Sequence, residues 1–198
     1  MKILIATSNR GKLRELRQIL EPLGIETIGL GDLPPIESPE ETGATFSANA
    51  RLKALYYAQH AGIPAIADDS GLCVDALNGE PGVRSARYSD PGATDRRNNA
   101  KLLAALTEQA ERRARFVCVS VCAKPTGEIV EARGECEGEI LAAPRGENGF
   151  GYDPVFYYAP LAATFAELPP EEKNRVSHRG RSLRRLAELL PSFLAGGK

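Results

Sequence analysis

Short apolar runs alternate with helical patterns in the first third of the chain. Apolar residues dominate 2–7 and 25–30, which predicts two strands, and leucines at helical spacing between them predict a helix that stops near Gly24. A second helix is predicted over 45–61, and the apolar run 63–67 reads as a buried strand. This order of strand, helix, strand, helix, strand is typical of an α/β sheet.

The remainder of the chain mixes long loops with strongly β-forming and helical segments. The predicted elements are a loop over 75–94, a helix over 95–112, hairpin arms at 114–124 and 128–137, a strand over 152–157 and a last helix from near Ser177. The pattern contains no repeat and no obvious linker. We therefore expect a single domain over 1–198, or two lobes that share a core.

Composition and charge exclude several classes of protein. The chain has 198 residues, of which 42% are hydrophobic, so it can bury a core rather than remain disordered. Its formal net charge of −1 argues against non-specific binding to nucleic acid or to an anionic membrane. No apolar stretch approaches the length of a membrane span, and the short apolar N-terminal run does not resemble a signal peptide.

The cysteines point to a reducing compartment. Cys118 and Cys122 lie on the same side of a predicted strand, which favours reduced thiols in the core. No C-x-x-C pair is present, and the only histidines are His60 and His178, so a zinc site is poorly supported. A cytoplasmic location is the simplest interpretation.

Two adjacent carboxylates, Asp68 and Asp69, follow the buried strand 63–67. They are expected where a strand meets a loop, which is where α/β sheets bind ligands, and Mg²⁺ is the commonest partner of such a pair. A solvated turn is the alternative, because Asp, Ser and Gly are ordinary turn residues. A carboxylate from the acidic loop 37–43 would complete a Mg²⁺ site that leaves positions for water and phosphate.

The loop from Thr7 to Lys12 joins a strand to the start of a helix. Free backbone N–H groups and the helix dipole suit such a place to phosphate, and Lys12 adds a positive charge. The spacing is not that of a P-loop. An ordinary helix N-cap is the other interpretation of Ser8 and Asn9.

Two further segments could complete a nucleotide site. Aromatic residues between glycines in 149–153 could stack on a base, although a turn with core aromatics would look the same. Lys173, His178 and Arg179 stand at or before the start of the last helix, where cations oppose the helix dipole, which hints at an anionic or electron-rich ligand. Surface charge is the alternative. Together the segments describe a site for a nucleoside triphosphate with Mg²⁺.

With these motifs, the chain resembles the inosine/xanthosine triphosphate pyrophosphatases, which remove deaminated purine nucleotides from the pool before they enter DNA and RNA. The matching motifs are T-S-N-R-G-K at 7–12, E-E-T-G at 40–43, F-S-A-N-A at 46–50, A-D-D-S-G-L at 67–72, S-A-R-Y at 85–88, G-F-G-Y-D-P at 149–154 and E-E-K-N-R-V-S-H-R at 171–179. They occur in the family's order and cover nearly the whole chain.

The resemblance implies a reaction, a fold and a set of site residues. A nucleoside triphosphate and water would give the monophosphate and pyrophosphate, with Mg²⁺ as cofactor, in a homodimer. The fold would be an elongated mixed α/β sheet flanked by helices, with the site in a central cleft between two lobes. Asp69 would be the proton acceptor and would hold the metal with Glu40. The substrate would be bound by Thr7, Ser8, Asn9, Arg10, Gly11, Lys12, Ser70, Phe150, Gly151, Tyr152, Asp153, Lys173, His178 and Arg179.

Several questions stay open from the sequence. Asp68 would tend to raise the pKa of Asp69 and Mg²⁺ would lower it. Glu41 could replace Glu40 as the metal ligand, and the role of Asp68 is not assigned. The alternative functions are a pyrophosphatase for modified pyrimidine nucleotides and a nucleotide sensor without turnover. A nucleic-acid-binding module is disfavoured by the lack of a basic stripe.

Overall fold

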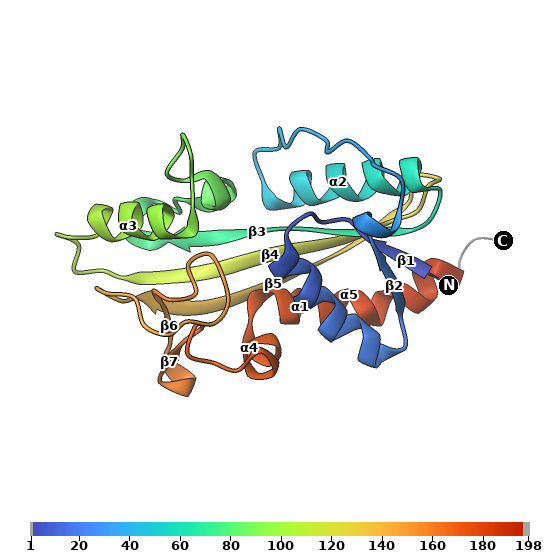
Figure 1. The fold of residues 1–198 in the computed structure, drawn as a ribbon. Coiled ribbons are helices and arrows are strands. Elements are labelled where there is room, and N and C mark those ends of the chain that lie inside the picture. The colour runs from blue at the N-terminus through green and yellow to red at the C-terminus, as the bar shows by residue number, and fades with distance from the viewer. Residues whose placement is uncertain (1, 196–198) are drawn as a thin grey trace. The chain divides into compact units, whose positions relative to one another are not determined.

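The computed structural model describes residues 2–195 (Figure 1). Its strands are β1 (Lys2–Ile5), β2 (Glu26–Gly29), β3 (Ala65–Val74), β4 (Arg113–Ala123), β5 (Ile129–Ile140), β6 (Phe156–Tyr158) and β7 (Ala163–Thr164). Its α-helices are α1 (Arg10–Leu20), α2 (Phe46–Ala61), α3 (Asp95–Ala105), α4 (Pro170–Val176) and α5 (His178–Ala195). The first half of this order confirms the predicted succession of strands and helices.

The strands form one mixed sheet of seven strands in the order β2-β1-β3-β4-β5-β6-β7. Strand β1 pairs in parallel with β2 and β3, whereas β6 pairs antiparallel with β5 and β7. The predicted mixed sheet flanked by helices is confirmed. The chain divides into two compact units, which are 1–69 with 118–134 and 178–198, and 70–117 with 135–177. The single domain and the central cleft stay predictions, and each unit is described by itself.

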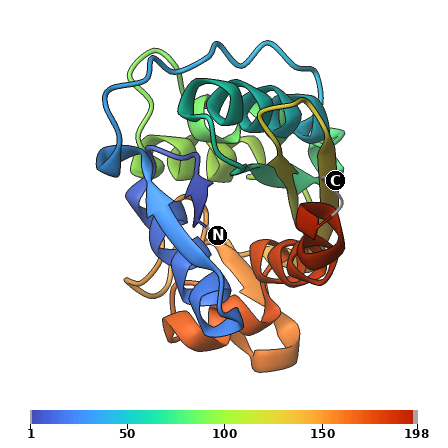
Figure 2. The ribbon, with the colours of Figure 1, turned by 90° about the vertical axis from the view of Figure 1, so that its right-hand side faces the viewer.

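Helices cover both faces of the sheet in the first unit. Ile3 and Ile5 of β1 belong to one hydrophobic cluster with residues of α1 and α5, whereas Leu4 and Ala6 belong to another with residues of α2. This division follows from the strand itself, since successive side chains point to opposite faces. Figures 1 and 2 show α2 on one face and α1 beside α5 on the other.

The second unit is built around aromatic residues. Phe116, Phe156 and Phe165 are buried in one cluster with Leu72 of β3 and Leu102 of α3. The rings of Phe116 and Phe156 lie 4.6 Å apart between centroids in a tilted arrangement, which is favourable for aromatic pairs. This cluster anchors α3 and the segment before β6, both of which are important for the candidate site.

The prediction that Asp68 and Asp69 follow the end of a strand is wrong. Strand β3 begins at Ala65 and continues through both aspartates to Val74. Asp, Ser and Gly have low intrinsic strand propensity, but tertiary partners override such preferences. Here the two carboxylates are buried within the strand, and cationic or amide groups of other elements contact each of them.

Two other predicted boundaries are corrected. Helix α3 ends at Ala105 rather than near 112, because the Arg112 guanidinium donates to the Leu106 carbonyl and caps the helix end. Strand β6 starts at Phe156 rather than 152, because the Asp153 carboxylate accepts from the Phe150 N–H and holds the chain in a turn. The short elements α4 and β7 were not predicted.

The cysteines have the expected form. Cys73, Cys118, Cys122 and Cys136 are all free thiols, and all but Cys73 are buried. Burial raises the pKa of both Cys118 and Cys122 to about 12, so their thiols stay protonated. Among residues 2–195, no helix combines the length and the apolar character that crossing a membrane requires.

Candidate active site

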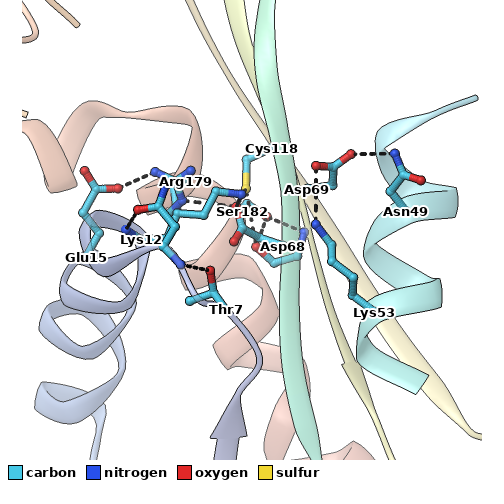
Figure 3. Close-up of polar contacts among 12 residues, drawn as sticks. Thr7, Lys12, Glu15, Asn49, Lys53, Asp68, Asp69, Cys118, Arg179 and Ser182 are labelled. Atoms are coloured by element: carbon cyan, nitrogen blue, oxygen red, sulfur yellow. Dashed lines mark hydrogen bonds and ion pairs between the residues drawn. The ribbon is translucent and has the colours of Figure 1, made fainter. Parts of the chain in front are cut away.

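Strand β3 sends its two aspartates to opposite faces of the sheet (Figure 3). Ile66 packs in the cluster with α1 and α5, whereas Ala65 and Ala67 pack in the cluster with α2. By the alternation of the strand, Asp68 faces α1 and α5, and Asp69 faces α2. The two neighbouring carboxylates therefore have different surroundings, although both are buried.

Asp68 belongs to a buried network of charges. Its Oδ2 lies 3.0 Å from the Lys12 Nζ and accepts from the Arg179 Nε at 3.3 Å. A second guanidinium nitrogen of Arg179 donates to the Glu15 carboxylate. Burial would raise the pKa of Asp68, but the charges of Lys12, Arg179 and Lys53 outweigh burial and hold it well below its ordinary value. Asp68 therefore stays ionised.

Arg179 is positioned by close packing of α5 on β5. Gly134 of β5 leaves room for the backbone at His178 and Ser182, because an added Cβ would overlap both. The Ser182 hydroxyl also donates to the Ala132 carbonyl at 2.9 Å. Burial lowers the pKa of Arg179, but the negative charges of Asp68 and Glu15 together have a larger effect and raise it above its ordinary value. The guanidinium therefore keeps its charge. The first turn of α5 thus delivers a buried cation to Asp68.

Asp69 is held by two residues of α2. Its Oδ2 accepts from the Asn49 Nδ2 at 3.1 Å, and its Oδ1 lies 3.5 Å from the Lys53 Nζ. Asn49 and Lys53 are four residues apart, so they share a face of the helix. Burial is the largest influence on the Asp69 carboxyl and raises its pKa, against the lowering effect of Lys53. A carboxylate with a raised pKa is a better proton acceptor near neutral pH.

The acidic loop is tied to the same place. The Asn49 Oδ1 accepts from the Gly43 N–H at 2.7 Å while its Nδ2 serves Asp69. The Lys53 Nζ lies 3.1 Å from a carboxylate oxygen of Glu41, which is half-buried, whereas Glu40 is exposed. The structure therefore links Glu41, more directly than Glu40, to Asp69.

The loop between β1 and α1 has the predicted capping geometry. The Asn9 side chain accepts from the Lys12 N–H at 3.0 Å, and the Asn9 N–H donates to the Thr7 hydroxyl at 3.2 Å. Ser8 and Arg10 are exposed, and Gly11 is half-buried. The loop therefore combines an Asn cap with the start of an eleven-residue helix, and phosphate binding stays a prediction.

A second group of predicted residues lies in the second unit. Asp153 is buried, and its Oδ2 accepts from the Phe150 N–H at 2.9 Å and lies 2.5 Å from the Lys173 Nζ. The same ammonium lies 4.8 Å from the centroid of the Phe150 ring, at cation–π distance. Lys173 lies on α4, before the start of the last helix, as the sequence analysis predicted. Ser70 of β3 is half-buried in this unit.

Sequence reasoning missed three residues of the charged networks. Glu15, Asn49 and Lys53 contact Arg179 or Asp69, and none of them was assigned a role. The sequence does contain a weak indication of these residues. Glu15 follows the phosphate-suited loop by about one helical turn, and Asn49 and Lys53 have the spacing of neighbours on one helix face. Their partners, however, lie on other elements, and a local pattern does not identify those.

The structure describes no complete metal site made by protein alone. Within residues 2–195, no three Asp, Glu, His or Cys side chains gather in a way that could hold a metal ion. The sequence predicted only two protein ligands, with water and phosphate in the other positions. Magnesium binding stays a prediction.

Comparison with known proteins places these residues in a wider context. The chain matches the Ham1 family over residues 3–189. It is 54% identical over 181 residues to the dITP/XTP pyrophosphatase of Syntrophobacter fumaroxidans, which covers 91% of this chain and 78% of that protein. It is 52% identical over 197 residues to the dITP/XTP pyrophosphatase of Exiguobacterium sp., with coverage of 99% and 100%.

Solved structures give the same result for the fold. A HAM1 protein from Coxiella burnetii matches with a TM-score of 0.87 and 42% identity, covering 97% of this chain and 99% of that one. The Ham1 protein of Staphylococcus aureus matches with a TM-score of 0.85 and 43% identity over 100% of both chains. Sequence and fold are therefore similar to these proteins over nearly the entire length.

Proposed function

Because the chain belongs to the Ham1 family, we propose that it hydrolyses the triphosphates of deaminated purines, ITP, dITP and XTP, to the monophosphate and pyrophosphate. This reaction keeps such nucleotides out of DNA and RNA. The observation that carries the proposal is the buried carboxylate of Asp69, which Asn49 and Lys53 of α2 hold in place. A site with this chemistry suits the activation of water.

The reaction places most of its demand on positioning and charge. Water attacks the α-phosphorus and pyrophosphate leaves, with no covalent intermediate on the protein. Asp69 accepts the proton of the attacking water. The loop from Thr7 to Lys12 binds the phosphates through the N-terminus of α1 and the Lys12 ammonium. Asp68 holds that ammonium in place through a contact of 3.0 Å.

The residues present fit Mg²⁺ as the cofactor. Asp69 and a glutamate of the 37–43 loop offer hard carboxylate oxygens, and Lys53 contacts both Asp69 and Glu41. We propose that Asp69 binds the ion together with Glu40, with Glu41 as the alternative that the contact to Lys53 favours. Bound there, Mg²⁺ would neutralise charge on the phosphate oxygens.

Base recognition is assigned to two groups of residues. Residues 150–153 with Lys173 form the stacking platform, supported by the contacts of Asp153 and Phe150 with the Lys173 ammonium. His178 or Arg179 is proposed to donate to the 6-oxygen of hypoxanthine or xanthine, where adenine carries an amine instead. A site that hydrogen-bonds the oxygen leaves its donor unpaired against the amine and so rejects ATP.

Location and assembly complete the proposal. The family resemblance supports a homodimer, and four free thiols suit the reducing cytoplasm.

An assay of several triphosphates tests the proposed reaction. With Mg²⁺, ITP, dITP and XTP are expected to release pyrophosphate much faster than GTP, ATP or a modified pyrimidine triphosphate, and chelation of the metal is expected to abolish turnover. Equal hydrolysis of ATP and ITP would contradict the assigned base pocket. Preference for the pyrimidine nucleotide would favour the rival pyrophosphatase, and binding without turnover would favour a sensor.

Paired glutamine variants decide which glutamate binds the metal. Glu40→Gln and Glu41→Gln each remove one carboxylate charge, and the variant at the true ligand is expected to need more Mg²⁺ for half-maximal rate. The measurement is the rate of ITP hydrolysis against Mg²⁺ concentration. Glu37→Gln in the same acidic loop is the matched control. Unchanged Mg²⁺ dependence in both variants would remove the loop from the metal site.

A further inference from the structure

Side chains of helix α3 form hydrogen bonds with both backbone polar groups of Gly151. The Gly151 N–H donates to the Asp95 Oδ2 at 2.7 Å, and the Gly151 carbonyl accepts from the Asn99 Nδ2 at 2.9 Å. Asp95 and Asn99 are four residues apart on α3, so their side chains stack on one face of the helix. One helix face therefore fixes both polar groups of a single loop residue.

These two hydrogen bonds fix the position of Gly151, which side-chain packing does not hold. Gly151 has φ +63, in the left-handed region that glycine visits freely, and a Cβ added there would meet no atom within 4 Å. Gly149, by contrast, is packed against the Asp153 carboxylate, which an added Cβ would overlap. The first part of the loop is thus held by Asp153, and Gly151 is held by α3.

The buried amide of Asn99 is energetically unfavourable for the folded protein. It is only 8% exposed, and its Oδ1 has no hydrogen-bond partner in the described part of the chain. A buried acceptor without a donor is unfavourable, and an apolar residue of similar size would avoid that cost. Its amide nitrogen donates to the Gly151 carbonyl, which points to a role in holding the loop.

We propose that Asp95 and Asn99 are positioning residues for base recognition. They hold Gly151 so that the part of the platform formed by Phe150 and Gly151 is preformed before the nucleotide binds. Without these hydrogen bonds, the nucleotide must order the loop when it binds. The lost conformational entropy then weakens substrate affinity and leaves the chemical step unchanged. This inference rests on the proposed function, in which residues 150–153 receive the purine base.

Variants at the two positions test the inference with two measurements. In the free protein, Asp95→Ala and Asn99→Ala are expected to speed amide hydrogen exchange in the peptide that contains residues 149–153. In the assay, they are expected to raise KM for ITP by about threefold to tenfold, the worth of one net hydrogen bond, with kcat little changed. Asp95→Asn keeps an acceptor oxygen and is expected to restore most of the wild-type KM.

Controls separate this role from general damage. Arg96→Ala alters an exposed residue on the same helical turn and is expected to leave both measurements unchanged. Asp95 is also exposed, so its alanine variant remains informative if Asn99→Ala does not fold. Unchanged exchange and KM in Asp95→Ala, or a fall in kcat without a rise in KM, would overturn the inference. A wild-type protein that does not hydrolyse ITP would instead overturn the proposed function, and this inference with it.

Discussion

Replacing Asp69 with asparagine is expected to lower turnover of ITP by about 10²–10⁴-fold, the usual cost of removing a general base. Asparagine has nearly the same shape as aspartate, so the fold and the contact with α2 should survive, but the amide does not accept the proton of the attacking water. Pyrophosphate release under saturating ITP measures the effect. Binding of ITP is expected to persist.

The same variant distinguishes the two roles proposed for Asp69. If its main role is to bind the metal, a large excess of Mg²⁺ will restore much of the rate; if it accepts the proton, the rate will stay low at every concentration. Asp75→Asn, at an exposed aspartate just beyond β3, is the matched control and is expected to retain full activity. Near-normal turnover of the Asp69 variant would end the assignment of Asp69 as the base.

Replacing Arg179 with methionine is expected to lower the free energy of unfolding by about 3–5 kcal/mol, as for other buried ion pairs that lose one partner. Methionine preserves much of the apolar volume but leaves Asp68 and Glu15 without the guanidinium that contacts both. Urea unfolding, monitored by circular dichroism, measures the loss. The effect is a property of the free protein and does not depend on substrate.

A neighbouring arginine provides the comparison. Arg185 lies on the same helix but is exposed, and its guanidinium donates to the Arg133 carbonyl at 2.7 Å. Arg185→Met is expected to cost no more than about 1 kcal/mol, since an exposed hydrogen bond contributes little. A similarly small loss in Arg179→Met would show that the buried network around Asp68 contributes little to stability.

Local patterns were sufficient for much of the fold and for part of the site. The succession from β1 to α2, the hairpin of β4 and β5 and the Asn9 cap each depend on neighbours within a few residues. The end of β3 was decided by distant groups, since partners on other elements allow the strand to continue through two aspartates. The end of α3 and the start of β6 depend on nearby side chains, Arg112 and Asp153, whose hydrogen bonds the hydrophobic pattern does not show.

The residues of the charged networks could not be predicted from local sequence patterns. Arg179 lies 111 residues from Asp68 and 164 from Glu15 along the chain, and the three meet only when α1, β3 and α5 pack together. Likewise, Asn49 and Lys53 look like ordinary polar helix residues until Asp69 is seen beside them. Spacing within a segment does not contain this information.

The pair Asp68 and Asp69 shows where the two sources of information divide. The sequence by itself determined that two carboxylates follow an apolar run and, given a strand, that they must point to opposite faces. Only the tertiary structure decided that α1 and α5 place Lys12 and Arg179 against one, while α2 places Asn49 and Lys53 beside the other. The cations around Asp68 outweigh its burial and lower its pKa, whereas burial outweighs the nearby cations at Asp69 and raises its pKa. The physical reason is that strand alternation is a local property of the backbone, whereas the charge that surrounds a side chain depends on contacts between distant parts of the chain.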